Sequence, residues 1–241
     1  VTPEQIKEAL TEKTKMLILS YPNNPTGAVL RHEDLVGIAE VLKDTDVIVL
    51  SDEIYAELCY GDEEYESIAH IEGMYDRTIV VNGFSKSFSM TGWRLGYAMG
   101  PKPLIETMTK IHQSCIMCSP TTSQYAGITA LTSCDEEILK MKEEYDFRRK
   151  YCVRKLNEMG LHTFEPRGAF YVFPNITSSG MDSDTFCMEL LKRKNVAIVP
   201  GTAFGESGEG FARISYAYSL SHLQTALGRI EDFLHEIKEE K

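Results

Sequence analysis

The sequence predicts an α/β fold followed by a smaller α+β domain. In the first part of the 241-residue chain, short apolar runs that suit buried strands alternate with amphipathic helical patterns. After Gly160 this alternation gives way to short strands and turns flanked by helices. We therefore expect a large domain at residues 1–135 and a small α+β domain at residues 136–241, bridged by a long charged helix near residues 136–159.

Local patterns predict the individual elements. Thr2 can cap a first helix that Pro3 opens, and acidic residues rich in Tyr and Gly predict a mobile surface loop at residues 57–66. In the large domain, the expected strands are residues 16–19, 47–50, 78–81 and 94–99, and the expected helices are residues 3–10, 32–43, 104–112 and 124–131. In the small domain, we expect strands at residues 162–166, 169–174, 196–200 and 212–217, and helices at residues 182–194 and 220–240.

Composition excludes several classes of function. A net charge of −11 disfavours a nucleic-acid groove or an anionic membrane surface, and no apolar run approaches the roughly 20 residues that span a bilayer. Cys115 and Cys118 form a Cys-x-x-Cys pair, but no second pair or nearby histidine completes a metal site. We interpret the six cysteines as reduced thiols of a cytoplasmic protein. The chain starts at Val1 without a Met or a signal peptide, which suggests a fragment.

A lysine follows the predicted strand at residues 78–81. Lys86 lies among small and hydroxyl residues just beyond the strand end, where desolvation can make its amine nucleophilic. Arg94 comes eight residues later, at the start of the next predicted strand. A solvated loop lysine is the ordinary alternative, and for an isolated lysine it would be preferred.

Three further motifs have ordinary alternatives of the same kind. Asn24 lies in Tyr-Pro-Asn-Asn-Pro-Thr-Gly, which forms a shaped loop and could be a simple turn. Asp52, Glu53 and Tyr55 leave the end of a predicted strand, where carboxylates can simply be solvated; for Glu53 we accept that interpretation. Arg213 stands between apolar strand residues, where its guanidinium could bind a carboxylate or reach the surface.

Together these motifs resemble those of the class I/II, fold-type I aminotransferases of the aspartate/aromatic type, which use pyridoxal 5'-phosphate. The resemblance implies that Lys86 binds the cofactor covalently and that Arg94 binds its phosphate. Many relatives carry a hydroxyl residue three positions before the lysine. Here that position is Gly83, so Ser85 or a backbone N–H is expected to contact the phosphate instead.

The same resemblance assigns the other residues. Asp52 would pair with the pyridine nitrogen, and Tyr55 would donate to the phenolic oxygen. Asn24 would contact that oxygen and help to seat the substrate, whose α-carboxylate Arg213 would bind. Residues 168–172 and 200–205 also resemble family segments near the substrate, without an assigned role.

The resemblance implies a doubly wound, mostly parallel sheet, truncated at the N-terminal side, and transfer of an amino group between an L-amino acid and a 2-oxo acid. Loops at the carboxyl ends of the first three strands would form the site. Relatives carry a long preceding segment that completes the cofactor site and the homodimer, so this chain alone is expected to be inactive. The alternatives are another fold-type I enzyme, such as a C–S lyase or a cyclising synthase, and a non-catalytic sensor domain.

Overall fold

The computed structural model describes residues 1–61 and 64–240 of the chain. These residues divide into two compact units. The first comprises Val1–Pro22 and Val29–Lys140, and the second comprises Asn23–Ala28 and the chain from Met141 onward. The short segment Asn23–Ala28 thus belongs to the second unit, although its sequence neighbours on both sides belong to the first. The domain boundary expected between residues 135 and 136 stays a prediction.

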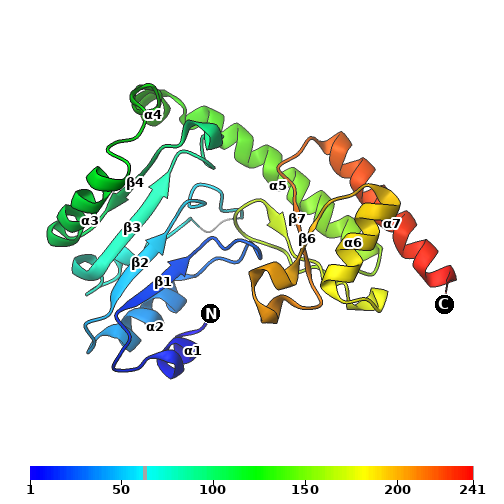
Figure 1. Ribbon diagram of the computed structural model, residues 1–241, viewed down its shortest axis with the longest axis horizontal. Helices are drawn as coiled ribbons and strands as arrows, with labels where there is room; N and C mark the ends of the chain where they lie inside the picture. The colour runs from blue at the N-terminus through cyan, green and yellow to red at the C-terminus, as the bar shows by residue number, and fades with distance from the viewer. Residues whose placement is uncertain (62–63, 241) are drawn as a thin grey trace. The chain divides into compact units, whose positions relative to one another are not determined.

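The first unit contains one four-stranded sheet with the order β1-β2-β3-β4 (Figure 1). The strands are β1 (Met16–Ser20), β2 (Ile48–Asp52), β3 (Thr78–Gly83) and β4 (Gly96–Met99). The first three run parallel and β4 is antiparallel to β3, which confirms the predicted α/β fold with its mostly parallel sheet. Because the register pairs Ser20 with Asp52, the carboxyl ends of β1 and β2 meet at one edge.

Two predicted helices precede and follow β1. Helix α1 (Pro3–Ala9) begins with a capping box, in which the Gln5 backbone N–H donates to Thr2 Oγ1 over 3.3 Å and the Thr2 N–H donates to Gln5 Oε1 over 2.9 Å. Helix α2 (His32–Leu42) buries one apolar face against the sheet. The residues of that face are Leu35, Ile38, Ala39 and Leu42, which pack in one core with Leu19 and Val49. Periodicity therefore located both helices correctly.

Three longer helices follow β4. Helices α3 (Lys102–Cys115) and α4 (Thr121–Ser133) start earlier than expected, each directly after a proline. Helix α5 (Asp135–Glu158) coincides with the predicted bridging helix, beginning in the first unit and continuing in the second. Short 3₁₀ turns lie at Ile68–His70, Tyr75–Arg77 and Thr91–Trp93. No helix within the described ranges is both long and apolar enough to cross a membrane.

The second unit contains a three-stranded antiparallel sheet with the order β5-β7-β6. Its strands are β5 (Tyr171–Val172), β6 (Val199–Pro200) and β7 (Ala212–Ser215), and its helices are α6 (Ser183–Lys194) and α7 (Leu220–Glu239). The strand expected at residues 162–166 is wrong. The Asn157 side chain takes both backbone groups of Thr163, accepting from its N–H over 3.0 Å and donating to its carbonyl over 3.1 Å.

The surface loop expected at residues 57–66 is also wrong for its first half. Leu58, Cys59 and Tyr60 are buried, so this segment contributes to the core of the first unit. Residues 62–63, within the same expected loop, lie outside the described residues.

Candidate active site

Lys86 lies in the turn that follows β3. Its side chain is half-buried, and its Nζ lies 5.8 Å from the centre of the Tyr55 ring. Tyr55 is itself buried, just beyond the end of β2. The topology therefore brings the predicted lysine and the predicted tyrosine together, because the carboxyl ends of adjacent parallel strands lie side by side.

Asp52 is the last residue of β2 and is half-buried. The Ser20 hydroxyl at the end of β1 donates to Asp52 Oδ2 over 3.4 Å, and the Ile54 backbone N–H donates to Oδ1 over 3.3 Å. These two contacts fix the carboxylate at the strand end, in the same region as Tyr55.

Glu53 is not the solvated carboxylate that we expected. It is buried and accepts hydrogen bonds from the Ser51 hydroxyl over 2.9 Å and the Ser67 hydroxyl over 2.5 Å. Burial and the charge of this carboxylate raise the pKa of Tyr65 well above its usual range. Side chains alternate along an extended segment, so Ser51 and Glu53 share a face while Asp52 takes the other.

Gly83 is required by the close approach of β4. A Cβ at this position would lie 2.9 Å from Gly96 Cα and 3.0 Å from the Leu95 carbonyl oxygen. A hydroxyl-bearing side chain at this position, which the family resemblance implies for many relatives, would therefore be crowded. Ser85, the expected substitute, is half-buried in the lysine turn, and its carbonyl accepts from the Thr91 hydroxyl over 3.0 Å.

Arg94 follows the short turn Thr91–Trp93 with a left-handed backbone conformation at φ +54°. Its guanidinium Nη1 donates to the Thr91 carbonyl over 3.0 Å, and its side chain is exposed. With Ser89, Trp93 and Ser123, among others, it lines an open hollow of about 440 Å³. In this hollow the guanidinium of Arg94, eight residues after Lys86, could donate hydrogen bonds to an anion.

Asn24 and Arg213 meet in the second unit. Arg213 Nη1 donates to Asn24 Oδ1 over 2.7 Å. The guanidinium carbon of Arg213 also lies 4.5 Å from the centre of the Tyr171 ring and 4.9 Å from that of Phe204. Arg213 Nε is buried and has no hydrogen-bond partner within the described part of the chain.

Sequence reasoning identified Asn24 and Arg213 but not the two rings beside the guanidinium. Tyr171 lies on β5, and Phe204 ends the 3₁₀ turn Gly201–Phe204. Both fall within segments that resemble family segments near the substrate, and this resemblance was the only signal for them. Of the predicted residues, Asp52, Tyr55, Ser85, Lys86 and Arg94 lie in the first unit, and Asn24 and Arg213 lie in the second.

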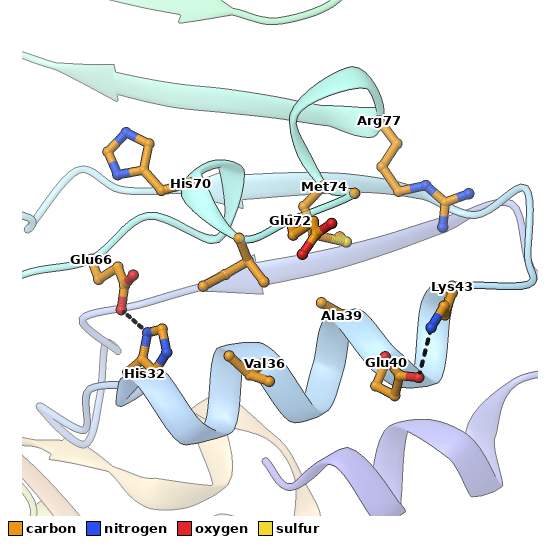
Figure 2. A pocket seen from close by; sticks show the side chains of 12 residues that line it. His32, Val36, Ala39, Glu40, Lys43, Glu66, His70, Glu72, Met74 and Arg77 are labelled. Atoms are coloured by element: carbon orange, nitrogen blue, oxygen red, sulfur yellow. Dashed lines mark hydrogen bonds and ion pairs between the residues drawn. The ribbon is translucent and has the colours of Figure 1, made fainter.

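A separate groove of about 560 Å³ lies on the first unit between α2 and residues 66–77 (Figure 2). At one end His32 Nδ1 lies 2.9 Å from Glu66 Oε2, and at the other Lys43 Nζ donates to Glu40 Oε1 over 3.1 Å. None of the predicted site residues lines this groove, and we assign it no function.

The chain is similar to known aminotransferases over nearly its whole length. The family model "Aminotransferase class I and II" matches residues 1–230. The chain is 48% identical over 239 residues to an aspartate aminotransferase of Pyrococcus abyssi and 44% identical over 239 residues to an aromatic-amino-acid aminotransferase of Thermococcus litoralis. Each comparison covers 98% of this chain and 61% of the relative.

A solved structure of an aromatic aminotransferase from Pyrococcus horikoshii matches with a TM-score of 0.96 at 46% identity, covering 99% of this chain and 64% of that one. The chain thus spans about three fifths of the length of these relatives. The matched family depends on pyridoxal 5'-phosphate. A match over nearly the whole chain, together with the lysine turn, the aspartate at the end of β2 and the paired arginine, establishes that the chain belongs to the aminotransferase class I and II family.

Proposed function

We propose that this chain supplies the cofactor and carboxylate sites of an aminotransferase that moves an amino group between an L-amino acid and a 2-oxo acid. The observation that supports the proposal most directly is the set of contacts made by the Arg213 guanidinium. Its guanidinium is held by Asn24 and by two aromatic rings, while its buried Nε has no hydrogen-bond partner among the described residues. A guanidinium donor without a partner costs about 1–3 kcal/mol, and a carboxylate bound by this guanidinium would offset that cost.

The chemistry of Arg213 suits a substrate carboxylate. A guanidinium presents a planar fork that binds the two oxygens of a carboxylate, and ring stacking leaves the edge of that fork available. Asn24 occupies one Nη1 donor and so fixes the rotation of the group. We propose that Arg213 binds the α-carboxylate that amino acids and 2-oxo acids share.

The first unit has polar groups that fit pyridoxal phosphate. An amine, a carboxylate and a phenol lie at or just beyond the carboxyl ends of β2 and β3, and an arginine follows after the lysine turn. Lys86 would hold the cofactor covalently, Asp52 would face its ring nitrogen and Tyr55 its phenolic oxygen. Arg94 and Ser85 would hold its phosphate. When bound, this cofactor carries the amino group and stabilises negative charge on the substrate α-carbon.

The residues of this chain then have distinct tasks. The Asp52 carboxylate favours a proton on the ring nitrogen, because an adjacent negative charge stabilises the cationic form. Lys86 Nζ, released from the cofactor when the substrate amino group takes its place, would be the base that removes the proton from the substrate α-carbon. Tyr55 donates its hydroxyl proton in a hydrogen bond to the phenolic oxygen. Arg213 holds the substrate by its carboxylate, which fixes the direction of the C–H bond.

Relatives of both the aspartate and the aromatic type match the chain, and we propose an acceptor of one of these two classes. We also propose a cytoplasmic homodimer. The location is supported by the cysteines, none of which forms a disulfide within the described residues. The dimer is supported only by the resemblance.

The test follows the nitrogen atom. The full-length protein, loaded with pyridoxal phosphate, is supplied with ¹⁵N-labelled L-aspartate or L-tyrosine and an unlabelled 2-oxo acid. Transfer of the label into a new amino acid, only when the 2-oxo acid is present, is the expected result. Release of labelled ammonia without an acceptor would indicate a lyase, and no reaction with either donor would overturn the proposal.

A further inference from the structure

We infer that Arg149 is a positioning residue for the carboxylate site. Through the segment Glu165–Gly168 it holds the loop Asn23–Ala28 in place and thereby sets Asn24 against Arg213. The inference rests on the proposed function, because it concerns the site at which Arg213 would bind the substrate. All of these residues belong to the second unit.

Arg149 is a buried cation that the proposed chemistry does not use. Its side chain on α5 is only 4% exposed. Nε and Nη2 donate to Asp146 Oδ1 over 2.9 and 2.7 Å, and Nη1 donates to Glu165 Oε1 over 2.6 Å and to the Pro166 carbonyl over 3.0 Å. Burial alone would lower the pKa of Arg149, but the hydrogen bonds to the two carboxylates outweigh it and raise the pKa.

A buried charge of this kind is costly to desolvate and adds little stability for its own sake. What it does provide is a fixed position, because one guanidinium joins α5 to the segment at residues 165–166 through two contacts, one to the Glu165 carboxylate and one to the Pro166 carbonyl. Lysine has a single ammonium centre and could not make the contacts to Asp146, Glu165 and Pro166 in the same geometry. The arginine therefore fixes where this segment lies.

The segment in turn fixes the loop that carries Asn24. The backbone N–H groups of Arg167 and Gly168 both donate to the Gly27 carbonyl over 2.9 Å. Gly27 has a φ of +71°, and an added Cβ would lie 2.4 Å from Pro166 Cβ and 2.8 Å from the Gly168 carbonyl oxygen. The loop thus contacts the very residue whose carbonyl Arg149 holds.

Within the loop the geometry is rigid. The Asn23 backbone N–H donates to the Ala28 carbonyl over 2.8 Å, and the Thr26 hydroxyl donates to Asn23 Oδ1 over 2.8 Å. Asn24 is the next residue, and its Oδ1 accepts from Arg213. A displacement of Gly27 would therefore move the Asn24 amide away from the guanidinium.

The same segment also reaches Arg213 from the other side. It continues into β5, where the Tyr171 ring stacks on the guanidinium. The Tyr216 hydroxyl, at the end of β7, donates to the Ala169 carbonyl over 3.1 Å. Two of the three neighbours that orient Arg213, the Asn24 amide and the Tyr171 ring, are thus anchored on residues 165–171, whereas the third, the Phe204 ring, lies on the turn Gly201–Phe204.

The test measures carboxylate binding separately from turnover. The full-length protein loaded with pyridoxal phosphate is titrated in a calorimeter with two non-reacting probes, maleate and 3-phenylpropionate. The variants are Arg149→Met, Arg149→Lys and Gly27→Ala, with Arg154→Met as a control on the same helix. Arg154 is 65% exposed and pairs only loosely with Glu158, at 3.8 Å.

We expect Arg149→Met and Gly27→Ala to weaken binding of the better probe by about tenfold, within the range of coupling in one hydrogen-bond network. Arg149→Lys should be intermediate, and Arg154→Met should stay within about twofold of the parent. KM for the amino acid should rise with the same pattern while kcat changes less. If Arg149→Met does not fold, Arg149→Lys and Gly27→Ala decide.

A double variant separates positioning from general loss of structure. If Arg149 acts only through Arg213, then Arg149→Met should add no further loss of probe affinity when Arg213→Ala is already present. Additive losses in the double variant would overturn the inference, as would unchanged affinity in Arg149→Met, Arg149→Lys and Gly27→Ala. If Arg213→Ala itself leaves probe affinity unchanged, or if neither probe binds the parent, the proposed carboxylate site is wrong and the inference falls with it.

Discussion

The contact between Gly83 and β4 predicts what happens when the hydroxyl of many relatives is introduced. The change is Gly83→Ser in the full-length protein. The new Cβ would lie 2.9 Å from Gly96 Cα and 3.0 Å from the Leu95 carbonyl oxygen, both of which are backbone atoms. Gly83 and Gly96 are paired in the sheet, so the strands must separate by several tenths of an ångström or shift.

Overpacking of this kind costs about 1–3 kcal/mol. We therefore expect the free energy of unfolding of Gly83→Ser to fall by about that amount in equilibrium urea titrations. We also expect no tighter binding of pyridoxal phosphate, because the strand must move to admit the hydroxyl. The control for stability is Gly92→Ala, since a Cβ at Gly92 would meet none of the described atoms within 4 Å. A Gly83→Ser protein as stable as its parent, with higher cofactor affinity, would refute this reasoning.

Four further predictions concern the chemistry, the acid stability and the isolated chain. Lys86→Ala should lose the covalent cofactor link that borohydride traps for mass spectrometry, and turnover at the parent's rate would show the lysine assignment to be wrong. Asp52→Ala should slow the chemical step in single-turnover kinetics. Arg213→Ala should instead weaken substrate binding by about 1.5–3 kcal/mol, measured as a rise in KM, and leave cofactor affinity unchanged. The reverse pattern would contradict both roles. Although burial opposes it, hydrogen bonds from a lysine and an arginine hold the pKa of Asp146 below its usual range. The contribution of Asp146 to the free energy of unfolding is therefore present above that range and is lost as the pH falls through the lowered pKa. In urea unfolding between pH 2 and 6, Asp146→Asn should lose less stability on acidification than the parent, and equal slopes would exclude this effect. Residues 1–241 alone should bind pyridoxal phosphate weakly and show no appreciable amino-group transfer. The reason is that both edge strands of the first sheet carry exposed apolar side chains, including Ile18 on β1, which is 64% exposed, and Met99 on β4, which is 54% exposed. Tight covalent binding with steady turnover would contradict this prediction.

Much of the fold could be predicted from the sequence, because periodicity records which face of an element is buried. Helix α2 shows this well, since its predicted apolar face is the face that packs on the sheet. The prediction of a strand at residues 162–166 was wrong for a reason that hydrophobic periodicity cannot show. A side chain on α5, Asn157, replaced a neighbouring strand as the partner of the backbone of Thr163.

The residues of the candidate site could be named from the sequence, but their arrangement could not. The lysine and arginine motifs are each contiguous in the sequence, so they can be recognised without knowledge of the fold. The rings of Tyr171 and Phe204 meet Arg213 only once β5, β7 and the turn after β6 are in place. The burial of Glu53 could have been anticipated, because it shares with Ser51 the face of the strand that points into the core.

The assignment of Asn23–Ala28 to the second unit has a consequence for the history of the chain. The polypeptide passes between the two units after Pro22, after Ala28 and after Lys140, so the second unit is not one continuous stretch of gene. Recombination at residue 140 would transfer residues 141–241 without the loop Asn23–Ala28, which packs beside Pro166. Transfer of residues 141–241 alone would therefore separate the second unit from the loop Asn23–Ala28.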